Sequence, residues 1–588
     1  MVPDNAESAT VVGRRRLAPE LSVESVDVSV NLDADESLKV PSSDESFRDW
    51  EVPDEHGFAL VAVTESDSGV DDCPEGPSDA ESVRDAASDT ASDRVSPSAS
   101  VAAFLQAMQP TRPEVLRGCP AHVASADFGR VFWTGGRDSF FHLSIVTEAY
   151  DEFVSHSWQV ATWRKCLLLV MLKRGAPAFL IAGLGAGLMI SIWQFGFLPG
   201  YVKAEYESDA PGLQHSFWCL VTGLVLAPLT LLFWRPRGII FLDRVCINQF
   251  DSRQKVEGIL NLGAILKASE SLLLVWDESY VDRLWCVFEL AAFLRSHPDM
   301  LTTMNLSKLK VVPAALGYVS LTTALTSLTF GFSGLMVPSG NVWLEWSIKT
   351  LLICFFASFI VDTFRAHFRA LDAMSTQLQN FELRKTSCWC CSVNHVHPTT
   401  SERLPCDRST INKCLITWFG SEQAFNEAVR SSVATALEQQ LGYDAFPYTW
   451  WLLSTSPYLW SLMDDLASLV GSSALREDAI QRLLVRYPIY WLFTYPTMFT
   501  WAMIFARCLR AKGRNRKAEF LRNALVTAMT TPSILLFVFW EIWTRIAFQR
   551  FVGSVIFVTS AVVSFLVSRL FYHWQHGKGI LQPNGSRS

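Results

Sequence analysis

Long apolar runs separated by charged segments occupy residues 150–588 of the chain. A helix of about 20 apolar residues spans the roughly 30 Å hydrocarbon core of a bilayer, so runs near that length are candidate membrane spans. The pattern therefore predicts a mainly α-helical, polytopic (multi-pass) integral membrane protein. The eight candidate spans are residues 176–198, 217–234, 311–337, 342–361, 446–463, 487–506, 524–543 and 551–571.

Lysine and arginine in the connecting segments predict which side of the membrane each segment faces, because short cytosolic loops are enriched in these residues. The loop between the first two spans is acidic, whereas basic residues lie at both outer ends of that pair. The most basic loop, residues 507–522, lies between the sixth and seventh spans. If the fifth candidate span, 446–463, crosses the membrane, both chain ends and this loop are cytosolic. If that segment only lies in the membrane interface, the basic loop faces outside. The identity of the membrane does not follow from the sequence.

Residues 1–125 have a different composition, rich in serine, aspartate, glutamate and proline. Such a segment buries too little apolar surface to offset the entropy lost on ordering, so we expect a disordered acidic tail. The whole chain has 588 residues and a mean hydropathy of +0.20, which is too apolar for an ordinary soluble enzyme. The net charge of −8 comes largely from the tail and indicates no nucleic-acid partner.

An α/β pattern lies on both sides of the first pair of spans. Residues 239–242 and 272–276 are short apolar runs typical of strands, and each is followed by a segment with helical periodicity, at 254–267 and 282–295. Strand, helix, strand, helix indicates a parallel sheet. A pair of crossings returns the chain to the side it left, so we expect the strand-like segment around Phe153 to pair with 239–242 or 272–276 in one sheet.

Three motifs in this region resemble those of Toll/interleukin-1 receptor (TIR) domains and of the related fungal heterokaryon-incompatibility domains. They are YDEFVSH at 150–156, LDRVCINQ at 242–249 and YVDRLWCVFEL at 280–290, in the family's order. The resemblance covers roughly 80 residues and implies a small cytosolic parallel-sheet domain whose first strand is central. The chain departs from the family in the inserted pair of spans and in the little room left after Arg295 for the last strands, which implies a truncated or remodelled domain.

The resemblance also implies roles for single residues. In TIR domains that cleave NAD, the glutamate of the third motif is catalytic, and Glu289 stands at that position, so NAD is a candidate substrate. A carboxylate suits this chemistry because it stabilises an oxocarbenium-like sugar. In TIR domains that act as adaptors the same carboxylate is structural, for example by pairing with an arginine. Both roles remain open for Glu289.

Other residues of the motifs are candidate ligand-binding residues. Asp243 and Arg244 follow a predicted strand, and open parallel sheets bind ligands at the carboxyl ends of their strands. Ser155 of the first motif and Trp285 of the third complete this set. The alternatives are an ion pair between Asp243 and Arg244 and a core position for Trp285.

A cluster of soft ligands follows the fourth span. Cys388, Cys390, Cys391, His395 and Cys406 supply enough sulfur and imidazole for a zinc site, although their spacing is not that of a standard zinc finger. Palmitoylation of these membrane-proximal cysteines is an alternative, and unmodified structural thiols are another. The helical pattern at 422–440 is expected to pack on the α/β piece.

These observations favour a membrane protein with a cytosolic TIR-like module that acts in signalling or protein–protein interaction. Its expected partners are the lipid bilayer and other TIR-like domains or a second copy of the chain. The alternatives are a membrane-bound NAD nucleosidase that uses Glu289 and a transporter or channel, which the few ionisable residues within the spans support little.

The expected organisation is a disordered tail (1–125), the first part of the TIR-like domain (126–175), two spans (176–234), its second part (235–300), two spans (311–361), a cytosolic Cys/His-containing helical region (362–445), four spans (446–571) and a cytosolic C-terminal tail (572–588).

Overall fold

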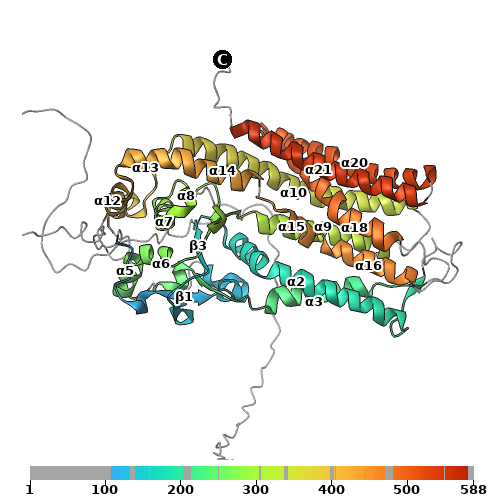
Figure 1. Ribbon diagram of the computed structural model, residues 1–588, viewed down its shortest axis with the longest axis horizontal. Helices are drawn as coiled ribbons and strands as arrows, with labels where there is room; N and C mark the ends of the chain where they lie inside the picture. Colours follow the sequence, from blue (N-terminus) through green and yellow to red (C-terminus); the bar gives the residue numbers. More distant parts are fainter. Residues whose placement is uncertain are drawn as a thin grey trace, which may run out of the picture. The chain divides into compact units, whose positions relative to one another are not determined.

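The computed structural model describes most of the chain from residue 107 onward, and the fold is mostly helical, with a small mixed sheet and a separate antiparallel pair of two-residue strands, β4 (Tyr201–Val202) and β5 (Gln214–His215) (Figure 1). The predicted disorder therefore lies largely outside the described residues. The predicted tail boundary at residue 125 is too late, however, because strand β1 (Arg117–Pro120) already belongs to the sheet. The described residues are 107–132, 139–157, 159–202, 214–248, 250–302, 306–336, 342–396, 401, 403, 406–443, 445–470, 481–548 and 550–580.

The larger sheet has the strand order β2-β1-β6-β3-β7-β8. Its last four members run parallel, while β1 is antiparallel to both of its neighbours. In chain order the four parallel strands are arranged 2-1-3-4, which is the start of the flavodoxin-like doubly wound order. The remaining strands are β2 (Ile145–Val146), β3 (Glu152–His156), β6 (Ile239–Phe241), β7 (Leu272–Trp276) and β8 (Leu309–Pro313).

The central strand β3 joins the two halves of the predicted α/β piece. Phe153 pairs in register with Phe241 of β6 on one side and with Leu272 of β7 on the other. All five residues of β3 are buried, as expected for a strand with neighbours on both sides and helices on both faces. The predicted pairing of the first strand with both later strands is confirmed.

The predicted third span begins too early. Its first residues form β8, which pairs with β7, and helix α9 (Leu316–Met336) starts only after Pro313. The apolar run of β8 continues into an apolar helix with no polar break, so periodicity alone cannot locate the boundary. The domain therefore has one more parallel strand than the sequence indicated.

Helices cover the sheet and one of its edges. The predicted helix 254–267 is two helices, α5 (Ser252–Leu260) and α6 (Leu262–Lys267), and the third motif forms α7 (Leu284–Ser296). At the β8 edge, Gln440 of α14 (Ala434–Tyr443) accepts from Val311 N at 2.8 Å and donates to Leu309 O at 2.6 Å. The expected packing of the 422–440 segment on the α/β piece is thus confirmed, and a side-chain amide takes the place of a further strand.

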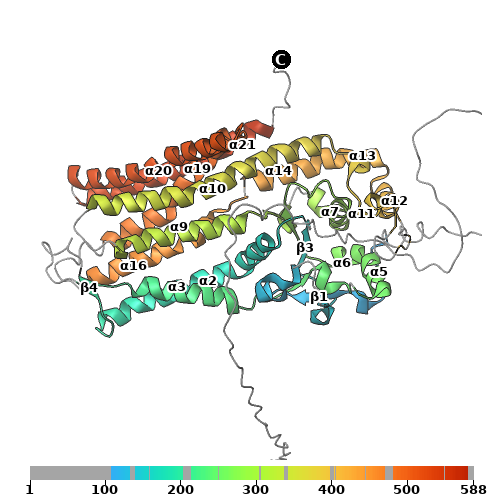
Figure 2. The same cartoon turned by 180° about the vertical axis from the view of Figure 1, so that it is seen from behind.

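The described residues at all eight predicted spans are largely helical, and four helices are long and apolar enough to cross a membrane: Thr162–Gln194, Thr350–Gln379, Arg516–Thr544 and Phe551–Gln575. Figure 2 shows these helices running side by side with the other apolar helices. The weak fifth segment is broken at Thr455. The helices are α2 (Thr162–Gln194), α3 (Trp218–Phe233), α9, α10 (Val342–Gln379), α15 (Tyr448–Ser454), α16 (Ser456–Val470), α19 (Tyr495–Cys508), α20 (Arg516–Ala547) and α21 (Arg550–Ile580).

Short segments of chain connect the α2–α3 hairpin directly to the sheet. Helix α2 begins six residues after the end of β3, and β6 begins six residues after the end of α3. Lys173 of α2 strengthens this junction, because its Nζ lies 2.6 Å from Glu152 Oε2 of β3. Arg174 joins the two helices of the hairpin by donating to the carbonyl of Leu231 in α3 at 2.7 Å. The sheet and the hairpin are therefore bound by polar contacts as well as by chain connection.

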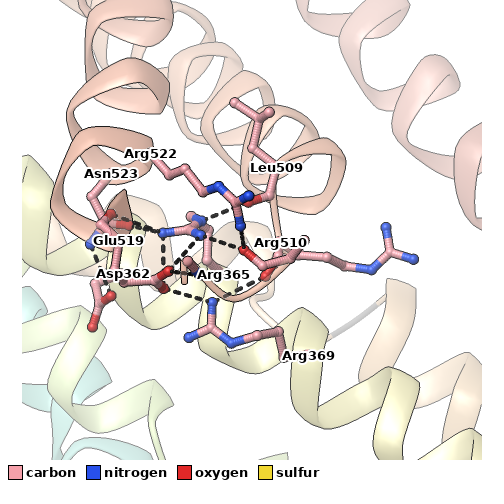
Figure 3. A network of polar contacts seen from close by, with 10 residues as sticks. Asp362, Arg365, Arg369, Leu509, Arg510, Glu519, Arg522 and Asn523 are labelled. Atoms are coloured by element: carbon pink, nitrogen blue, oxygen red, sulfur yellow. Dashed lines mark hydrogen bonds and ion pairs between the residues drawn. The ribbon is translucent and has the colours of Figure 1, made fainter. Parts of the chain in front are cut away.

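A fully buried arginine holds the basic loop against helix α10 (Figure 3). The guanidinium of Arg365 donates to the carbonyls of Leu509 at 2.8 Å and Ala511 at 3.0 Å, and it lies 3.1 Å from Glu519 Oε1. Arg369, one turn further along α10, reaches the same oxygen at 3.0 Å. Because a guanidinium presents several donors in a fixed plane, this single side chain fixes the connection between α19 and α20.

Candidate functional site

Polar residues gather where the parallel strands end. His156 is the last residue of β3 and Ser157 follows it, Asp243 comes two residues after β6, and Asp277 directly follows β7. These ends lie at one edge of the sheet because the three strands are parallel neighbours. Open α/β sheets bind ligands at this edge, and the change of strand order at β3 opens the crevice there. The carboxyl edge is therefore the candidate functional site.

Glu289 lies beneath this edge on α7. Its side chain is buried, with 8% exposure, and Ser155 Oγ donates to Glu289 Oε2 at 2.5 Å. The Ser155 hydroxyl is also 2.7 Å from the hydroxyl of Tyr280. The structure thus brings together Ser155 and Glu289, two of the predicted site residues, in a buried hydrogen-bonded trio with Tyr280.

Burial sets the charge states at this edge. Desolvation raises the pKa of Glu289 to about 8, so its carboxyl keeps a proton at neutral pH. Desolvation also raises the pKa of the partly buried Asp243 to about 6. The hydrogen bond from the backbone N–H of Arg244 and the nearby charges of Lys165 and Arg244 lower this pKa but only partly offset the desolvation. The basic side chains of Lys165, Arg244 and Arg283 lie near Asp243 at this edge, and such side chains can bind an anionic ligand.

The rim of the edge has polar atoms without protein partners. Asp277 Oδ2 accepts from Ser279 at 2.8 Å, and Ser279 in turn is 2.8 Å from Ser157 Oγ. Among the described residues, the buried atoms Asp277 Oδ1 and Arg283 Nη1 have no hydrogen-bond partner. Buried polar groups are normally satisfied, so these two atoms mark where a polar ligand or water would bind.

The other predicted ligand-binding residues have different positions. Arg244 extends over the ring of Phe140, with its guanidinium carbon 5.7 Å from the ring centroid, and its backbone N–H donates to Asp243 Oδ1 at 2.6 Å. Trp285 faces away from the edge toward helix α12 (Asp407–Phe419), where its indole N–H donates to Asp407 Oδ2 at 3.2 Å. Trp285 thus belongs to a helix contact rather than to the cluster of Ser155 and Glu289.

Sequence reasoning missed several residues of the edge. Asp277 follows its strand as Asp243 follows β6, so the same rule about strand ends would have found it. Lys165, which donates to Ser157 O at 3.4 Å, comes from the first turn of α2. Lys165 lies within the segment 126–175 that the sequence analysis assigned to the α/β domain, but outside the three motifs, so no motif pointed to it.

The predicted metal ligands also converge. The ligand atoms of Cys390, Cys391, His395 and Cys406 all lie within 4.8 Å of one another. Cys388 belongs to a second group with Cys390 and Asp407. The cluster therefore lies at the amino-terminal end of α12, beside the contact with Trp285.

A separate cavity of about 80 Å³ lies among α9, α10, α16, α19 and α20. Several threonines line it, and most of their hydroxyls bond to their own helices, as in the contact from Thr530 to Val526 O at 2.8 Å and from Thr531 to Thr527 O at 2.9 Å. The hydroxyls of Thr323 and Thr527 have no hydrogen-bond partner among the described residues. Methyl groups and aromatic rings therefore form most of its wall. This cavity suits an apolar molecule better than an ion.

Comparison of the chain with models of protein families, with curated proteins and with solved structures finds no match. The interpretation of the carboxyl edge therefore rests on its own geometry. That geometry combines a neutral buried acid, three basic side chains near Asp243 and two unsatisfied polar atoms, Asp277 Oδ1 and Arg283 Nη1.

Proposed function

We propose that the chain is a multi-pass membrane protein whose TIR-like module acts in signalling or protein–protein interaction at the cytosolic face. The observation that carries this proposal is the direct pairing of Phe153 with Phe241 across the intervening α2–α3 hairpin. The order of the three motifs and the central position of the first strand support the family resemblance. The basic loop held by Arg365 supports the cytosolic side for the same end of the helices.

The connections between sheet and helices support a signalling role. Strand β3 leads into α2, α3 leads into β6, and only two residues separate β8 from α9. Packed interfaces move between discrete arrangements rather than deform continuously. A displacement of α2 against α3 would therefore be transmitted to the register or spacing of the central strand.

The burial of Glu289 supports an interaction module over an NAD nucleosidase. A carboxyl that is neutral and bonded to Ser155 resembles a structural group in the core, not a carboxylate presented to a sugar. The basic side chains of Lys165, Arg244 and Arg283 at the edge support the binding of an anionic ligand, which a signalling module can use as its stimulus. NAD cleavage remains the rival that the experiment below tests.

The two edges of the sheet suggest where a partner binds. Gln440 covers the β8 edge, whereas β2 is open, with Ile145 46% and Val146 50% exposed. An exposed edge strand is a template for pairing with another chain. We assign this edge to contact with a second TIR-like module, either of another copy or of a related protein.

The experiment uses two differently tagged full-length copies expressed together and solubilised from membranes. We expect co-purification that is lost when Ile145 and Val146 are both changed to lysine, because charges at an edge oppose strand pairing. The matched control is Ile416→Lys on α12, a residue of similar exposure. Co-purification that the edge change leaves intact would contradict the assigned contact.

The same preparation tests the rival activity. Purified protein is incubated with NAD, and nicotinamide release is measured for the unchanged chain and for Glu289→Gln. We expect no release above that of Glu289→Gln. Release that depends on Glu289 would replace the interaction module with an NAD nucleosidase.

A further inference from the structure

Four potential metal ligands come together from two segments near the end of the α/β domain. Cys390 and Cys391 belong to the one-turn helix α11 (Trp389–Ser392), His395 follows in a turn, and Cys406 immediately precedes α12. Asn394 and His395 have φ values of 54° and 57°, a conformation that residues other than glycine adopt rarely. This turn folds the imidazole back onto the cysteines, with His395 Nε2 3.6 Å from Cys391 Sγ.

The spacing of these atoms matches a tetrahedral site. Zn–S bonds of about 2.3 Å and a Zn–N bond of about 2.0–2.1 Å place tetrahedral ligands about 3.8 Å apart for sulfur pairs and about 3.6 Å apart for sulfur and nitrogen. The sulfur of Cys391 lies 4.0 Å from that of Cys390 and 3.9 Å from that of Cys406. We propose that Cys390, Cys391, His395 and Cys406 bind one zinc ion.

The donor set and its compactness favour zinc. Three thiolates and one imidazole in tetrahedral arrangement select zinc or iron–sulfur chemistry among biological metals. All four ligand atoms lie within 4.8 Å of one another, which leaves room for one ion but not for a cluster of iron and sulfide. Four protein ligands close the coordination shell, so the site is structural rather than catalytic.

Cys388 lies outside this shell. Its sulfur is 3.2 Å from Cys390 Sγ, but Cys388 groups with Cys390 and Asp407 instead of with the other three ligands. The backbone N–H of Asp407 donates to Cys390 Sγ at 3.3 Å, as expected of a group that supports a metal-bound thiolate. The difference between Cys388 and its neighbours makes the ligand set testable residue by residue.

Zinc at this position would tie three elements together. It would join the turn after α11 to the start of α12, whose first residue, Asp407, accepts from Trp285 of α7. The segment before the cluster is also attached to the start of α7, because Leu284 N donates to Ser387 O at 3.0 Å. The ion would therefore stabilise the position of the helix that carries Glu289.

The test is metal analysis of the full-length chain, purified in detergent without chelators. We expect about one zinc per chain, and a loss of at least fivefold in Cys390→Ser, Cys391→Ser and Cys406→Ser. Cys388→Ser should keep its zinc, as should Cys508→Ser, the control for an exposed thiol outside the cluster. Iron in place of zinc, no metal, or equal zinc in the Cys406→Ser and Cys508→Ser proteins would overturn the proposal.

A second measurement uses the unchanged protein, so it does not depend on whether the variants fold. X-ray absorption at the zinc edge of the unchanged protein should fit three sulfurs at about 2.3 Å and one nitrogen at about 2.0–2.1 Å. Mass spectrometry of the same sample should find Cys391 and Cys406 without fatty acyl groups. Acyl groups on these cysteines, or a shell without sulfur, would contradict the proposed site.

Discussion

The state of Glu289 gives the sharpest test of the reasoning about the carboxyl edge. Burial raises the pKa of this carboxyl to about 8 from the ordinary glutamate value of 4.5. Between these two values the folded chain holds a proton that the unfolded chain has released. Unfolding then releases a proton, so a rise in pH lowers the free energy of unfolding. The loss begins above pH 4.5 and is complete once the pH passes the folded-state value.

The size of the effect follows from the same two values. Each pH unit in that window lowers the free energy of unfolding by about 1.36 kcal/mol. Ionisation of Glu289 therefore lowers the free energy of unfolding by about 3 kcal/mol at pH 7 and by about 5 kcal/mol above pH 8. Glutamine has nearly the shape of a protonated glutamate and cannot ionise. We therefore expect Glu289→Gln to match the unchanged protein near pH 5 and to exceed its stability by about 3 kcal/mol at pH 7.

The assay is thermal unfolding of the detergent-solubilised chain, followed through the α/β domain at several values from pH 5 to pH 9. One kcal/mol corresponds to about 2–4 °C in the midpoint of a domain of 150–250 residues, so the expected difference is measurable. Glu278→Gln, at an exposed position beside β7, serves as the control. A Glu289→Gln protein that is less stable at every pH would refute the reasoning, because Glu289 would then be an ionised group paired with a cation.

Three further predictions concern the helices. Arg365→Leu should lower the free energy of unfolding by about 3 kcal/mol or more, because Glu519 and several carbonyls lose their buried cation. Thermal unfolding measures this loss, and Arg369→Leu, at a more exposed position, is the control. An effect no larger than that of Arg369→Leu would contradict the network in Figure 3. Gly317→Ala should lower the free energy of unfolding by about 1–3 kcal/mol, because a Cβ there would lie 2.7 Å from Leu168 N. In the same assay Gly183→Ala should be tolerated, because a Cβ at Gly183 would have nothing within 4 Å. Equal effects of the two changes would count against the packing of α9 on α2. A glycosylation tag near residue 206 should be modified and one near residue 514 should not, if the basic loop is cytosolic; modification at 514 would remove the fifth crossing.

The sequence predicted those features that depend on local pattern. Apolar runs located the long helices, and the motif around Phe153 led to the correct pairing of β3 with both β6 and β7. It failed where two apolar elements adjoin, as at β8 and α9, because a buried strand and an apolar helix have the same composition over a few residues. It also failed for β1, since four residues with one central cysteine give no alternation to detect.

The candidate site was predictable only in part for a related reason. Glu289 and Ser155 lie in motifs that a reader can find in the sequence, and the cysteine cluster is visible from its composition. Arg365 acts through partners far away in the chain, as in the 144-residue separation between Arg365 and Leu509. Such contacts arise from the packing of distant elements, so local periodicity cannot reveal them.

The insertion of α2 and α3 between two paired strands also has a consequence for biosynthesis. Strand β3 is made first, yet its partner Phe241 follows Phe153 by 88 residues (241 − 153). At about 5–20 residues per second of translation, about 4–18 seconds pass before β3, which is buried at all five positions in the folded sheet, can meet its first parallel neighbour. During that interval a strand with two open edges can pair with other chains. The order of synthesis therefore makes β3 the segment of the domain most in need of a chaperone, until the hairpin has formed and β6 has emerged from the ribosome.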